Sequence, residues 1–363
     1  MKVVTVLGAR PQFIKAGSVS REIARQRDLG TDLTEVIVHT GQHFDNNMSD
    51  VFFQEMRIPA PDYHLGIGGK SHGAMTGRML ERIEEVLVEQ QPDWTLVYGD
   101  TNSTLAGALA ACKLGIPVAH VEAGLRSFNM AMPEEINRIL TDRVSRLLLC
   151  PTQTAMHNLE REGIADWKTD ADWLLCGDVM LDGALFYSQF ATPPEGVPEH
   201  ETFVLCTVHR AENTDNPGRI AGVIDALNAI THECKVIFPV HPRTKNILLK
   251  SGLDVSRLTL LDPVGYLNML WLLKHCTHVF TDSGGLQKEA FYFQKPCFTL
   301  RNETEWVELV DHGFNVLVGT EAENILHSWR GHKFSSQWDA LWYGAGKASQ
   351  VVVHALQGIN VKG

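Results

Sequence analysis

The sequence lacks any apolar run that approaches the length of a membrane span. Its 363 residues are 44% hydrophobic and 21% charged, but no stretch comes near the ~20 consecutive apolar residues of a transmembrane helix. The first residues, MKVVTVLGARPQ, include one Lys and a short apolar run but no small-residue cleavage site. We interpret them as a first core strand rather than a signal peptide. No membrane partner is expected.

Paired cysteines and an excess of basic residues are also lacking. The seven cysteines are scattered and none forms a C-x-x-C pair, which is typical of reduced thiols in a cytoplasm. The formal net charge is −11, whereas nonspecific nucleic-acid binding requires a basic face. No nucleic-acid partner is therefore expected. The negative net charge does not exclude a small anionic ligand, because a local cluster of Arg, Lys and backbone N–H groups can dominate the electrostatic potential inside a cleft.

Two nucleotide-binding fingerprints are absent. The stretch GARPQFIK is not G-x-G-x-x-G, and no G-x-x-x-x-G-K-[ST] occurs, so neither an NAD site nor a P-loop is predicted. His39 and His43 have a spacing that suits zinc on a helix, but TGQH follows a strand and contains Gly. We therefore expect no metal and no cofactor.

What the chain does contain is an alternation of short apolar runs with amphipathic helical segments such as GRMLERIEEVLVEQQ and GRIAGVIDALNAI. Continuous apolar strands separated by such helices are typical of parallel sheets covered on both faces. The sequence predicts an α/β fold with two Rossmann-like, doubly wound domains that face each other across a cleft. The predicted strands are residues 3–8, 34–40, 95–100, 117–122, 147–150, 203–209, 235–241, 258–263, 278–282, 296–300 and 315–319.

The two series of strands are separated near GDVMLDGALFYSQFATPPEGVPEHE, and its Pro/Gly-rich second half is the best candidate for a linker. We predict an N-terminal domain over residues 1–177 that carries catalytic carboxylates. The C-terminal helix, 346–363, is expected to pack back on it. Residues 178–345 are predicted to form a second, UDP-binding domain.

Ionisable groups follow nearly every predicted strand. Ligands of doubly wound sheets bind beyond the carboxyl ends of the strands, and loops of purely structural importance would not require so many Arg, His and carboxylate groups there. The sequence therefore predicts a functional cleft. Its candidate residues are Arg10, Lys15, Asp100 and Glu122 in the first half, and His209, Arg210, His241, Arg243, Ser283, Gly284, Gly285, Arg301, Glu303 and Glu305 in the second.

The stretch FTDSGGLQKEA (280–290) places Ser-Gly-Gly where a strand ends and a helix begins. Backbone N–H groups and the positive end of the helix dipole favour an anion at such a junction. The alternative is a tight turn without a ligand. Glu289 would either bind a ribose diol or complement the dipole at the surface.

Each carboxylate of the first half also has a structural alternative. Asp100 would cap the helix after GDTNS, and Glu122 would pair with Arg126 four residues on. In MPEEINRIL, Glu134 would form an i,i+4 ion pair with Arg138.

In their order and spacing, these motifs resemble those of the non-hydrolysing UDP-N-acetylglucosamine 2-epimerases, bacterial enzymes of the two-domain glycosyltransferase-B architecture. The likeness extends over about nine-tenths of the chain, through GARPQFIK, GDTNSTLAGALAA, HVEAGLRS, PEEINR, HRAEN, DSGGLQKEA and NVLVGT. It implies an isomerase that interconverts UDP-GlcNAc and UDP-ManNAc for cell-surface polysaccharide precursors. UDP would be eliminated anti to the C2 proton, leaving a 2-acetamidoglucal, and then added back. A homodimer is implied as well.

The resemblance assigns roles to the site residues. Gln42 and His43 match an allosteric site of some members, although GIGGKSHG lacks the downstream Arg-Gln pair of that site. The catalytic residues it implies are Asp100, Glu122, Glu134 and His209. With the strand-end groups, the predicted residues that bind the UDP-sugar are Arg10, Lys15, Arg138, Arg210, His241, Ser283, Gly284, Gly285, Glu289 and Arg301.

Three motifs depart from the family pattern. Members acting on UDP-N-acetylglucosamine typically contain GTRPEAIK, HRRE and TERPE, whereas this chain contains GARPQFIK, HRAEN and TEWVE. The variants resemble relatives that epimerise UDP-2,3-diacetamido-2,3-dideoxy-D-glucuronate in O-antigen synthesis, so this sugar is an alternative substrate. A UDP-sugar glycosyltransferase, a hydrolysing epimerase and a non-enzymatic UDP-sugar sensor are further alternatives.

Overall fold

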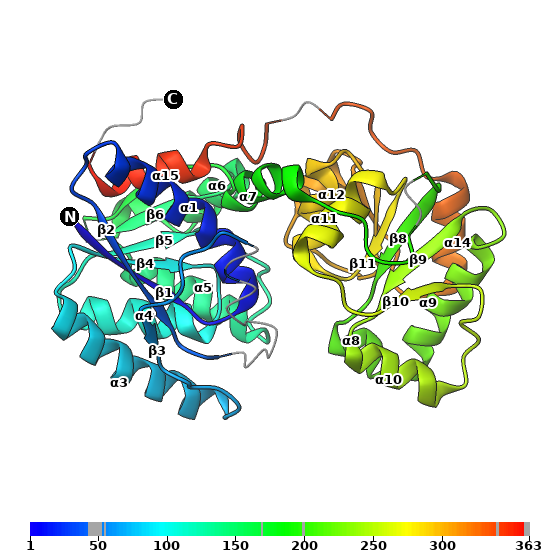
Figure 1. The fold of residues 1–363 in the computed structure, drawn as a ribbon, viewed down its shortest axis with the longest axis horizontal. Helices are drawn as coiled ribbons and strands as arrows, with labels where there is room; N and C mark the ends of the chain where they lie inside the picture. Colours follow the sequence, from blue (N-terminus) through cyan, green and yellow to red (C-terminus); the bar gives the residue numbers. More distant parts are fainter. Residues whose placement is uncertain (43–52, 54–55, 168–169, 198–199, 339–340, 359–363) are drawn as a thin grey trace. The chain divides into compact units, whose positions relative to one another are not determined.

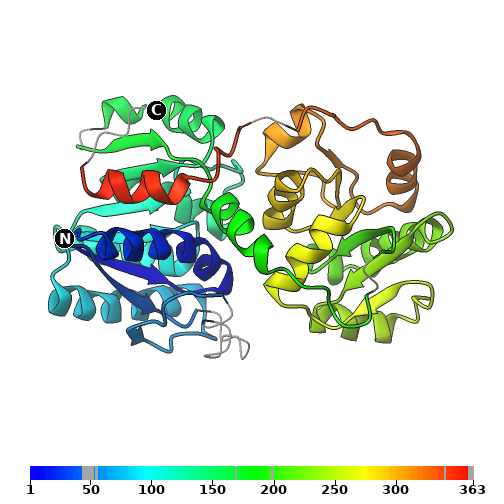
Figure 2. The ribbon, with the colours of Figure 1, turned by 45° about the horizontal axis from the view of Figure 1, so that its top comes forward.

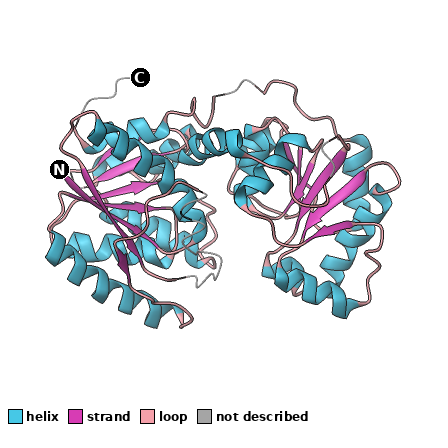
Figure 3. Cartoon of the chain, viewed as in Figure 1, coloured by secondary structure: helices cyan, strands magenta, loops and turns pink. Residues whose placement is uncertain are grey.

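The computed structural model describes residues 1–42, 53, 56–167, 170–197, 200–338 and 341–358. The chain divides into two compact units, Met1–Gly183 with Leu341–Gly363, and Ala184–Ala340. Each unit is an α/β layer structure in which helices cover a parallel sheet (Figures 1 and 3). None of the helices that the structure describes is long and apolar enough to cross a membrane.

The first unit is built on a seven-stranded sheet of order β3-β2-β1-β4-β5-β6-β7. All of its strand pairs are parallel. The strands are β1 (Lys2–Leu7), β2 (Thr34–His39), β3 (Tyr63–His64), β4 (Trp94–Tyr98), β5 (Val118–Val121), β6 (Leu147–Cys150) and β7 (Asp172–Leu175). The described helices are α1 (Arg10–Asp28), α3 (His72–Gln90), α4 (Asn102–Lys113), α5 (Pro133–Val144), α6 (Gln153–Arg161), a 3-10 turn (Ile164–Asp166), α7 (Val179–Tyr187) and α15 (Ala348–Leu356).

Helices lie on both faces of this sheet. Helix α15, red in Figure 2, lies alongside α1 on one face, while α3, α4 and α5 lie next to one another on the other. Helix α4 approaches the sheet closely because its inner residues are small. A Cβ on Gly107 would already lie 3.2 Å from side-chain atoms of Val6 and Val97. The central strands are therefore buried from both sides, as their continuous apolar runs predict.

The second unit contains a six-stranded parallel sheet of order β10-β9-β8-β11-β12-β13. Its strands are β8 (Phe203–Thr207), β9 (Lys235–Pro239), β10 (Thr259–Leu261), β11 (Val279–Thr281), β12 (Cys297–Thr299) and β13 (Asn315–Leu317). The described helices are a 3-10 turn (Ser188–Phe190), α8 (Ala211–Thr214), α9 (Pro217–Ile230), α10 (Pro242–Ser251), α11 (Tyr266–His275), α12 (Gly284–Tyr292), α13 (Val307–Asp311) and α14 (Ala322–Gly331). Helices α9 and α14 pack against each other over the core that includes Val223, Phe280 and Phe298.

Every strand predicted from the sequence is present, which confirms the two parallel α/β sheets. Strands β3 and β7, which form the two edges of the first sheet, were not predicted from the sequence. Neither is a continuous apolar run: β3 has two residues, and β7 (Asp-Trp-Leu-Leu) is only partly buried. Edge strands are covered less completely, so the pattern that marks a central strand is weak in them.

The transition between the units lies inside helix α7, since the first unit ends at Gly183 and the second begins at Ala184. The Pro/Gly-rich stretch expected to form the linker follows α7 within the second unit. Helix α15 returns to the first unit and contacts α1. The domain bounds expected from the sequence, 1–177 and 178–345, and the cleft between the domains stay predictions.

The strand order reverses once in each sheet. In the first, the chain winds outward from β1 in one direction and from β4 in the other; in the second, β8 and β11 occupy the same positions. At such a reversal the connections after the two central strands lead to opposite faces, so a crevice opens at the carboxyl edge. This feature determines where each unit places its functional groups.

Candidate functional site

In the first unit, charged residues gather where β1, β4 and β5 end. Arg10 is the first residue of α1, and Lys15 follows one and a half turns later. The Lys15 ammonium lies 2.5 Å from the carboxylate of Glu122, which is 4% exposed. Glu122 therefore pairs with Lys15, and the alternative that it pairs with Arg126 is wrong. Arg126 instead forms ion pairs with Asp142 and Glu162.

The backbone around Glu122 has an uncommon conformation. Glu122 has a φ of 72°, in the left-handed region, which a non-glycine residue adopts at a cost of order 1 kcal/mol or more. Gly99, after β4, has a φ of 64°, and a Cβ there would lie 3.1 Å from the Glu122 carboxylate. Because Gly99 has no side chain, the Glu122 carboxylate has space to lie next to it.

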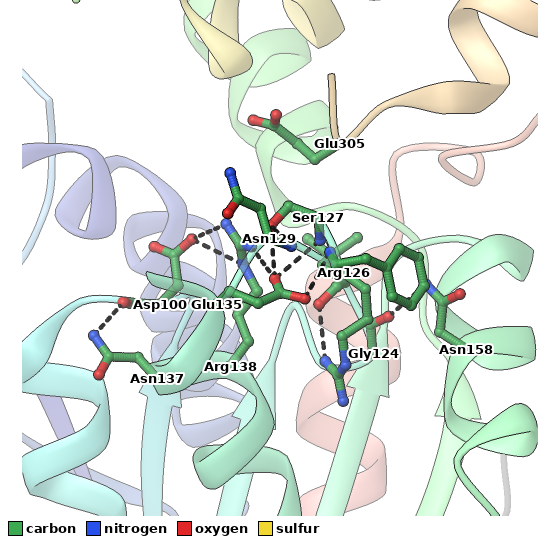
Figure 4. Close-up of polar contacts among 12 residues, drawn as sticks. Asp100, Gly124, Arg126, Ser127, Asn129, Glu135, Asn137, Arg138, Asn158 and Glu305 are labelled. Atoms are coloured by element: carbon green, nitrogen blue, oxygen red, sulfur yellow. Dashed lines mark hydrogen bonds and ion pairs between the residues drawn. The ribbon is translucent and has the colours of Figure 1, made fainter. Parts of the chain in front are cut away.

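Arg138 connects Asp100 to the helix α5 (Figure 4). Its Nη2 and Nε donate to Oδ2 of Asp100 at 2.7 and 3.1 Å, and its Nη1 donates to Glu135 at 2.7 Å. The guanidinium is 8% exposed, whereas the Asp100 side chain is 33% exposed. Because Oδ1 of Asp100 takes no part in this ion pair, the carboxylate is oriented while one oxygen is left for chemistry. The N-cap of α4 is Thr101, so Asp100 is not its cap.

The paired glutamates of PEEINR differ in their surroundings. Glu134, the predicted catalytic carboxylate, is exposed in the first turn of α5. Glu135 is fully buried and accepts hydrogen bonds from the Ser127 and Phe128 N–H groups as well as from Arg138. The alternative that Glu134 forms an ion pair with Arg138 is therefore wrong: Arg138 is bound by Glu135, three residues before it, and by Asp100.

Several buried polar residues that position the site were missed by the sequence analysis. Gln12 accepts hydrogen bonds from the Gly8 and Ala9 N–H groups and donates to the Tyr98 carbonyl, which connects the ends of β1 and β4. His120, inside β5, donates from Nε2 to the Gly99 carbonyl, and its Nδ1 is hydrogen-bonded to the Asp142 carboxylate. The sequence signal for His120 was a polar residue inside an otherwise apolar run, PVAHVE. The signal for Gln12 was its place in GARPQFIK, where it was interpreted only as a departure from the family motif.

The proposed allosteric pair is described only in part. The Gln42 side-chain oxygen accepts hydrogen bonds from the N–H and hydroxyl of Ser103 at the start of α4. His43 lies outside the described residues. His39, its predicted partner in the rejected zinc site, packs edge-on against Phe13, and burial lowers its pKa to about 4. Among the residues that the structure describes, no three His, Cys, Asp or Glu side chains gather as a metal site would require.

In the second unit, Ser283 caps helix α12, its hydroxyl accepting a hydrogen bond from the Leu286 N–H. Gly284 and Gly285 begin the helix. A Cβ on Gly284 would lie 2.3 Å from the carboxylate of Glu305, so this anion lies directly over the first helical residue. Arg301 donates to Glu305 at 2.9 Å, and Arg210 lies 4.0 Å from it. The junction accommodates an anionic group.

Asp282 connects the two central strands of the second sheet, and it too was missed. It is fully buried and accepts hydrogen bonds from the His209 and Arg210 N–H groups and from Asn213. The His209 ring nitrogen Nδ1 lies 3.4 Å from it. Burial lowers the pKa of His209 although Asp282 acts in the opposite direction. His209 and Arg210 are thus held at the strand end next to Ser283.

Two further predicted residues have distinct surroundings. Glu289 is 5% exposed and accepts a hydrogen bond of 2.7 Å from the Tyr266 hydroxyl. The alternative that it is a surface residue is therefore wrong. His241 is exposed at the N-cap of α10, where its ring accepts a hydrogen bond from the Arg243 N–H.

The two units therefore present different chemistry at their strand reversals. The first places the Asp100 and Glu122 carboxylates next to the cations Lys15 and Arg138. Such groups stabilise positive charge and move protons. The second has a helix N-terminus with two arginines and a histidine, which suits an anionic ligand.

The buried carboxylate of Glu135 predicts a pH dependence of stability. Burial alone would raise its pKa, but the Ser127 and Phe128 N–H groups and Arg138 hold the pKa below the ordinary 4.5. A depressed carboxyl pKa adds stability above the unfolded value, and this stability is lost as the pH falls through the folded value. Glu135→Gln should therefore lower the free energy of unfolding by about 1–3 kcal/mol at pH 7. The difference from the wild type should shrink below pH 4.5.

Urea unfolding followed by circular dichroism at several pH values measures this difference. Glu134→Gln is the matched control. Because Glu134 is exposed, its replacement should not change the pH dependence of the free energy of unfolding. An unchanged difference between pH 7 and pH 3 would contradict the assignment.

Comparisons with known proteins support the likeness seen in the motifs. A family model described as UDP-N-acetylglucosamine 2-epimerase matches residues 26–357. UDP-2,3-diacetamido-2,3-dideoxy-D-glucuronate 2-epimerase from Pseudomonas aeruginosa is 54% identical over 358 residues, which cover 98% of this chain and 99% of that protein. The crystal structure of Methanocaldococcus jannaschii UDP-GlcNAc 2-epimerase in complex with UDP-GlcNAc and UDP matches with a TM-score of 0.85 at 39% identity, covering 99% of this chain and all of that one.

The UDP-GlcNAc 2-epimerase from Neisseria meningitidis bound to UDP-GlcNAc matches with the same TM-score, 0.85, at 29% identity, over 99% of this chain and 100% of that one. These likenesses extend over both units and confirm the predicted fold class of two Rossmann-like domains of glycosyltransferase-B type. With a family model that extends over most of the residues and relatives that match end to end, the chain belongs to the UDP-N-acetylglucosamine 2-epimerase family.

Proposed function

We propose that this chain is a non-hydrolysing UDP-sugar 2-epimerase whose preferred substrate is UDP-2,3-diacetamido-2,3-dideoxy-D-glucuronate, with UDP-N-acetylglucosamine as the second candidate. The observation that carries the activity is the cluster of Asp100, Glu122 and their cations at the strand reversal of the first unit. The observation that favours the uronate is the 54% identity to the Pseudomonas aeruginosa enzyme over nearly the whole chain. The departures HRAEN and TEWVE agree with this choice.

The reaction explains why carboxylates are needed. The C2–H bond of a UDP-sugar is not next to a carbonyl and is very weakly acidic, so direct deprotonation is unfavourable. UDP departs and the C2 proton, which lies anti to it, is removed by a base, which leaves a glycal. A proton is then delivered to the other face of C2, and UDP adds again. Positive charge develops on the ring as UDP departs, and nearby carboxylates stabilise it. Acid–base help at C2 contributes about 10²–10⁴-fold in rate.

The first unit would carry out the proton transfers. Asp100 and Glu122 would act at C2, and the exposed Glu134 would orient the ring or share the proton transfer. Lys15 at 2.5 Å keeps an opposite charge next to Glu122. Arg138 holds Asp100 by one oxygen, so proton transfer at the other oxygen leaves the ion pair in place.

The second unit would bind UDP. The start of α12, with Arg210, Arg301 and His209, would hold the diphosphate, and Glu289 would bind the ribose diol. Arg10 and Lys15 would add positive charge for the diphosphate and sugar. Retention of UDP is essential to this route because its loss would end the cycle at the glycal.

The family resemblance supports two further parts of the proposal. We propose that the enzyme acts as a homodimer without a cofactor. The cysteines that the structure describes are all free thiols, in agreement with a cytoplasmic enzyme.

The test is incubation of the chain with each UDP-sugar alone in D₂O, followed by proton NMR. We expect the 2-epimer to form without any acceptor, to carry deuterium at C2 and to form faster from the uronate. Faster turnover of UDP-N-acetylglucosamine would overturn the choice of sugar. Free UDP with a released sugar would indicate the hydrolysing reaction, and a need for an acceptor would indicate a glycosyltransferase. Epimerisation without deuterium would exclude the proton-exchange route.

Replacement of Asp100 separates catalysis from binding. Asp100→Asn keeps the side-chain shape but removes the base, so kcat should fall by about 10²–10⁴-fold. The affinity for UDP, measured by calorimetry, should stay the same because Asp100 would act on the sugar ring and not on UDP. Asp225→Asn, an exposed aspartate on α9, is the control. Near-wild-type turnover of Asp100→Asn would remove Asp100 from the mechanism.

Glu305 provides a test of the diphosphate position. Its carboxylate already lies over Gly284 and contacts Arg301, so it would repel a diphosphate bound there. Glu305→Gln keeps the shape without the charge and should tighten UDP binding by about two- to fivefold at low salt, the range of a partly exposed charge pair. Glu303→Gln, an exposed neighbour, should leave the affinity unchanged. Weaker or equal binding of UDP to Glu305→Gln would place the diphosphate elsewhere.

A further inference from the structure

His120 lies fully buried within β5, two residues before Glu122. None of the steps above uses it. Its Nδ1 lies 2.6 Å from the Asp142 carboxylate, and its Nε2 lies 2.8 Å from the Gly99 carbonyl oxygen. Both ring nitrogens of this buried imidazole are hydrogen-bonded, and it lies next to a strand end that carries a catalytic candidate. It therefore does more than fill space in the core.

Both contacts of His120 are with hydrogen-bond acceptors. The Gly99 carbonyl oxygen can only accept, so Nε2 must carry a proton. The other Asp142 oxygen already accepts hydrogen bonds from Arg126 at 2.7 Å and from the Gly124 N–H at 3.1 Å. An ionised Asp142 accepts at both oxygens, which requires a proton on Nδ1 as well. The geometry thus favours the doubly protonated imidazolium.

The charges around this ring agree with that state. Asp142 faces His120 directly, Arg126 lies on the far side of Asp142, and Glu162 neutralises Arg126 at 2.7 Å. Burial alone would raise the pKa of Asp142, but His120 and Arg126 together lower it. A buried positive charge is tolerated only when it is paired in this way.

The Gly99 carbonyl that His120 holds is the group immediately before Asp100. The N–H of the same glycine donates to the Val121 carbonyl at 3.0 Å. The turn after β4 is thus fixed at both the N–H and the carbonyl of Gly99 by β5, the strand that Glu122 follows. Since Gly99 and Glu122 both have left-handed backbone, this bracing maintains a conformation that the chain would otherwise relax.

The other partner of His120 connects to Asp100 by a second route. Asp142 and Arg138 are one turn apart on α5, and Arg138 binds the Asp100 carboxylate. Asp100 is consequently held from two directions: its backbone through Gly99 and His120, and its side chain through Arg138. Both routes meet at α5 and close a ring of contacts, Gly99–His120–Asp142–α5–Arg138–Asp100.

We propose that His120, donating from both ring nitrogens, is a positioning residue for the reaction. It fixes the distance between the turn that carries Asp100 and the strand end that carries Glu122. It contacts no substrate. This inference rests on the proposed epimerase function for its kinetic consequence, but the hydrogen-bond arrangement can be tested without any activity.

The structural part is tested by NMR on the unliganded wild-type chain labelled with nitrogen-15 histidine. At about pH 8 an exposed imidazole is neutral, but His120 should show protons on both ring nitrogens, with signals that disappear in His120→Asn. Partly buried His278 is the internal reference, because its Nδ1 has no hydrogen-bond partner and burial lowers its pKa. A single N–H at His120 would overturn the doubly donating arrangement.

The kinetic part uses His120→Asn and Asp142→Asn, each of which breaks one link of the ring. Misplacement of catalytic groups by about 1 Å costs up to 10²-fold in rate, so kcat and deuterium uptake at C2 should fall together by about 10–100-fold. The calorimetric affinity for UDP should be unchanged. His278→Asn, which replaces a partly buried histidine of the second unit, should keep its kcat.

The outcomes separate the proposals. Lower melting temperatures with an unchanged kcat per folded enzyme would reduce His120 to a structural residue and overturn the inference. If His120→Asn fails to fold, Asp142→Asn and the wild-type NMR decide instead. A wild-type chain that epimerises none of the UDP-sugars would overturn the proposed function and the kinetic role, whereas the NMR result would still decide the hydrogen-bond arrangement.

Discussion

The reversal of strand order in each sheet is the constraint on which the functional groups depend. Parallel strands end at one edge, and only at the reversal do successive connections lead to opposite faces and leave that edge open. In the first unit the reversal lies between β1 and β4, next to Lys15 and Asp100; in the second it lies between β8 and β11, next to His209 and Ser283. Both units thus have the same reversal of strand order, which carries carboxylates with paired cations in the first unit and a helix N-terminus with two arginines in the second.

The polar groups at these edges are held by buried partners rather than by solvent. Arg138 and Asp142 on α5, and Asp282 after β11, are almost inaccessible and nearly saturated with hydrogen bonds. Buried ion pairs are poor sources of net stability, because desolvation offsets much of the attraction. Here the buried charges fix orientation. Arg138 holds the Asp100 carboxylate in one position, and Asp282 holds the backbone turn at His209 and Arg210. A solvent-exposed ion pair would not restrict its partners in this way.

The start of α12 in the second unit is likewise held by a few neighbouring charged groups. Ser283 caps α12, glycine at 284 leaves room above the helix end, and Glu305 places a carboxylate there beside Arg301 and Arg210. The N-terminus of α12 thus already has a carboxylate, that of Glu305, beside it. An enzyme that must release and recapture a charged leaving group needs such a balance, since a diphosphate held too tightly would not add back to the sugar.

Local sequence determined much of this protein. The apolar runs predicted each central strand, and the motifs predicted that Asp100, Glu122, His209 and Ser283 lie at the carboxyl edges of the two sheets, where the structure has them. Short edge strands such as β3 escaped, since partial burial leaves no continuous apolar pattern. Only the tertiary structure decided the partners: Lys15 for Glu122, Glu135 rather than Glu134 for Arg138, and His120 between Gly99 and Asp142. The pairings of Lys15 with Glu122 and of His120 with Gly99 and Asp142 join residues far apart in the chain, so spacing along the sequence could not predict them. Both glutamates lie within about one helical turn of Arg138, and only the burial of Glu135 decides between them.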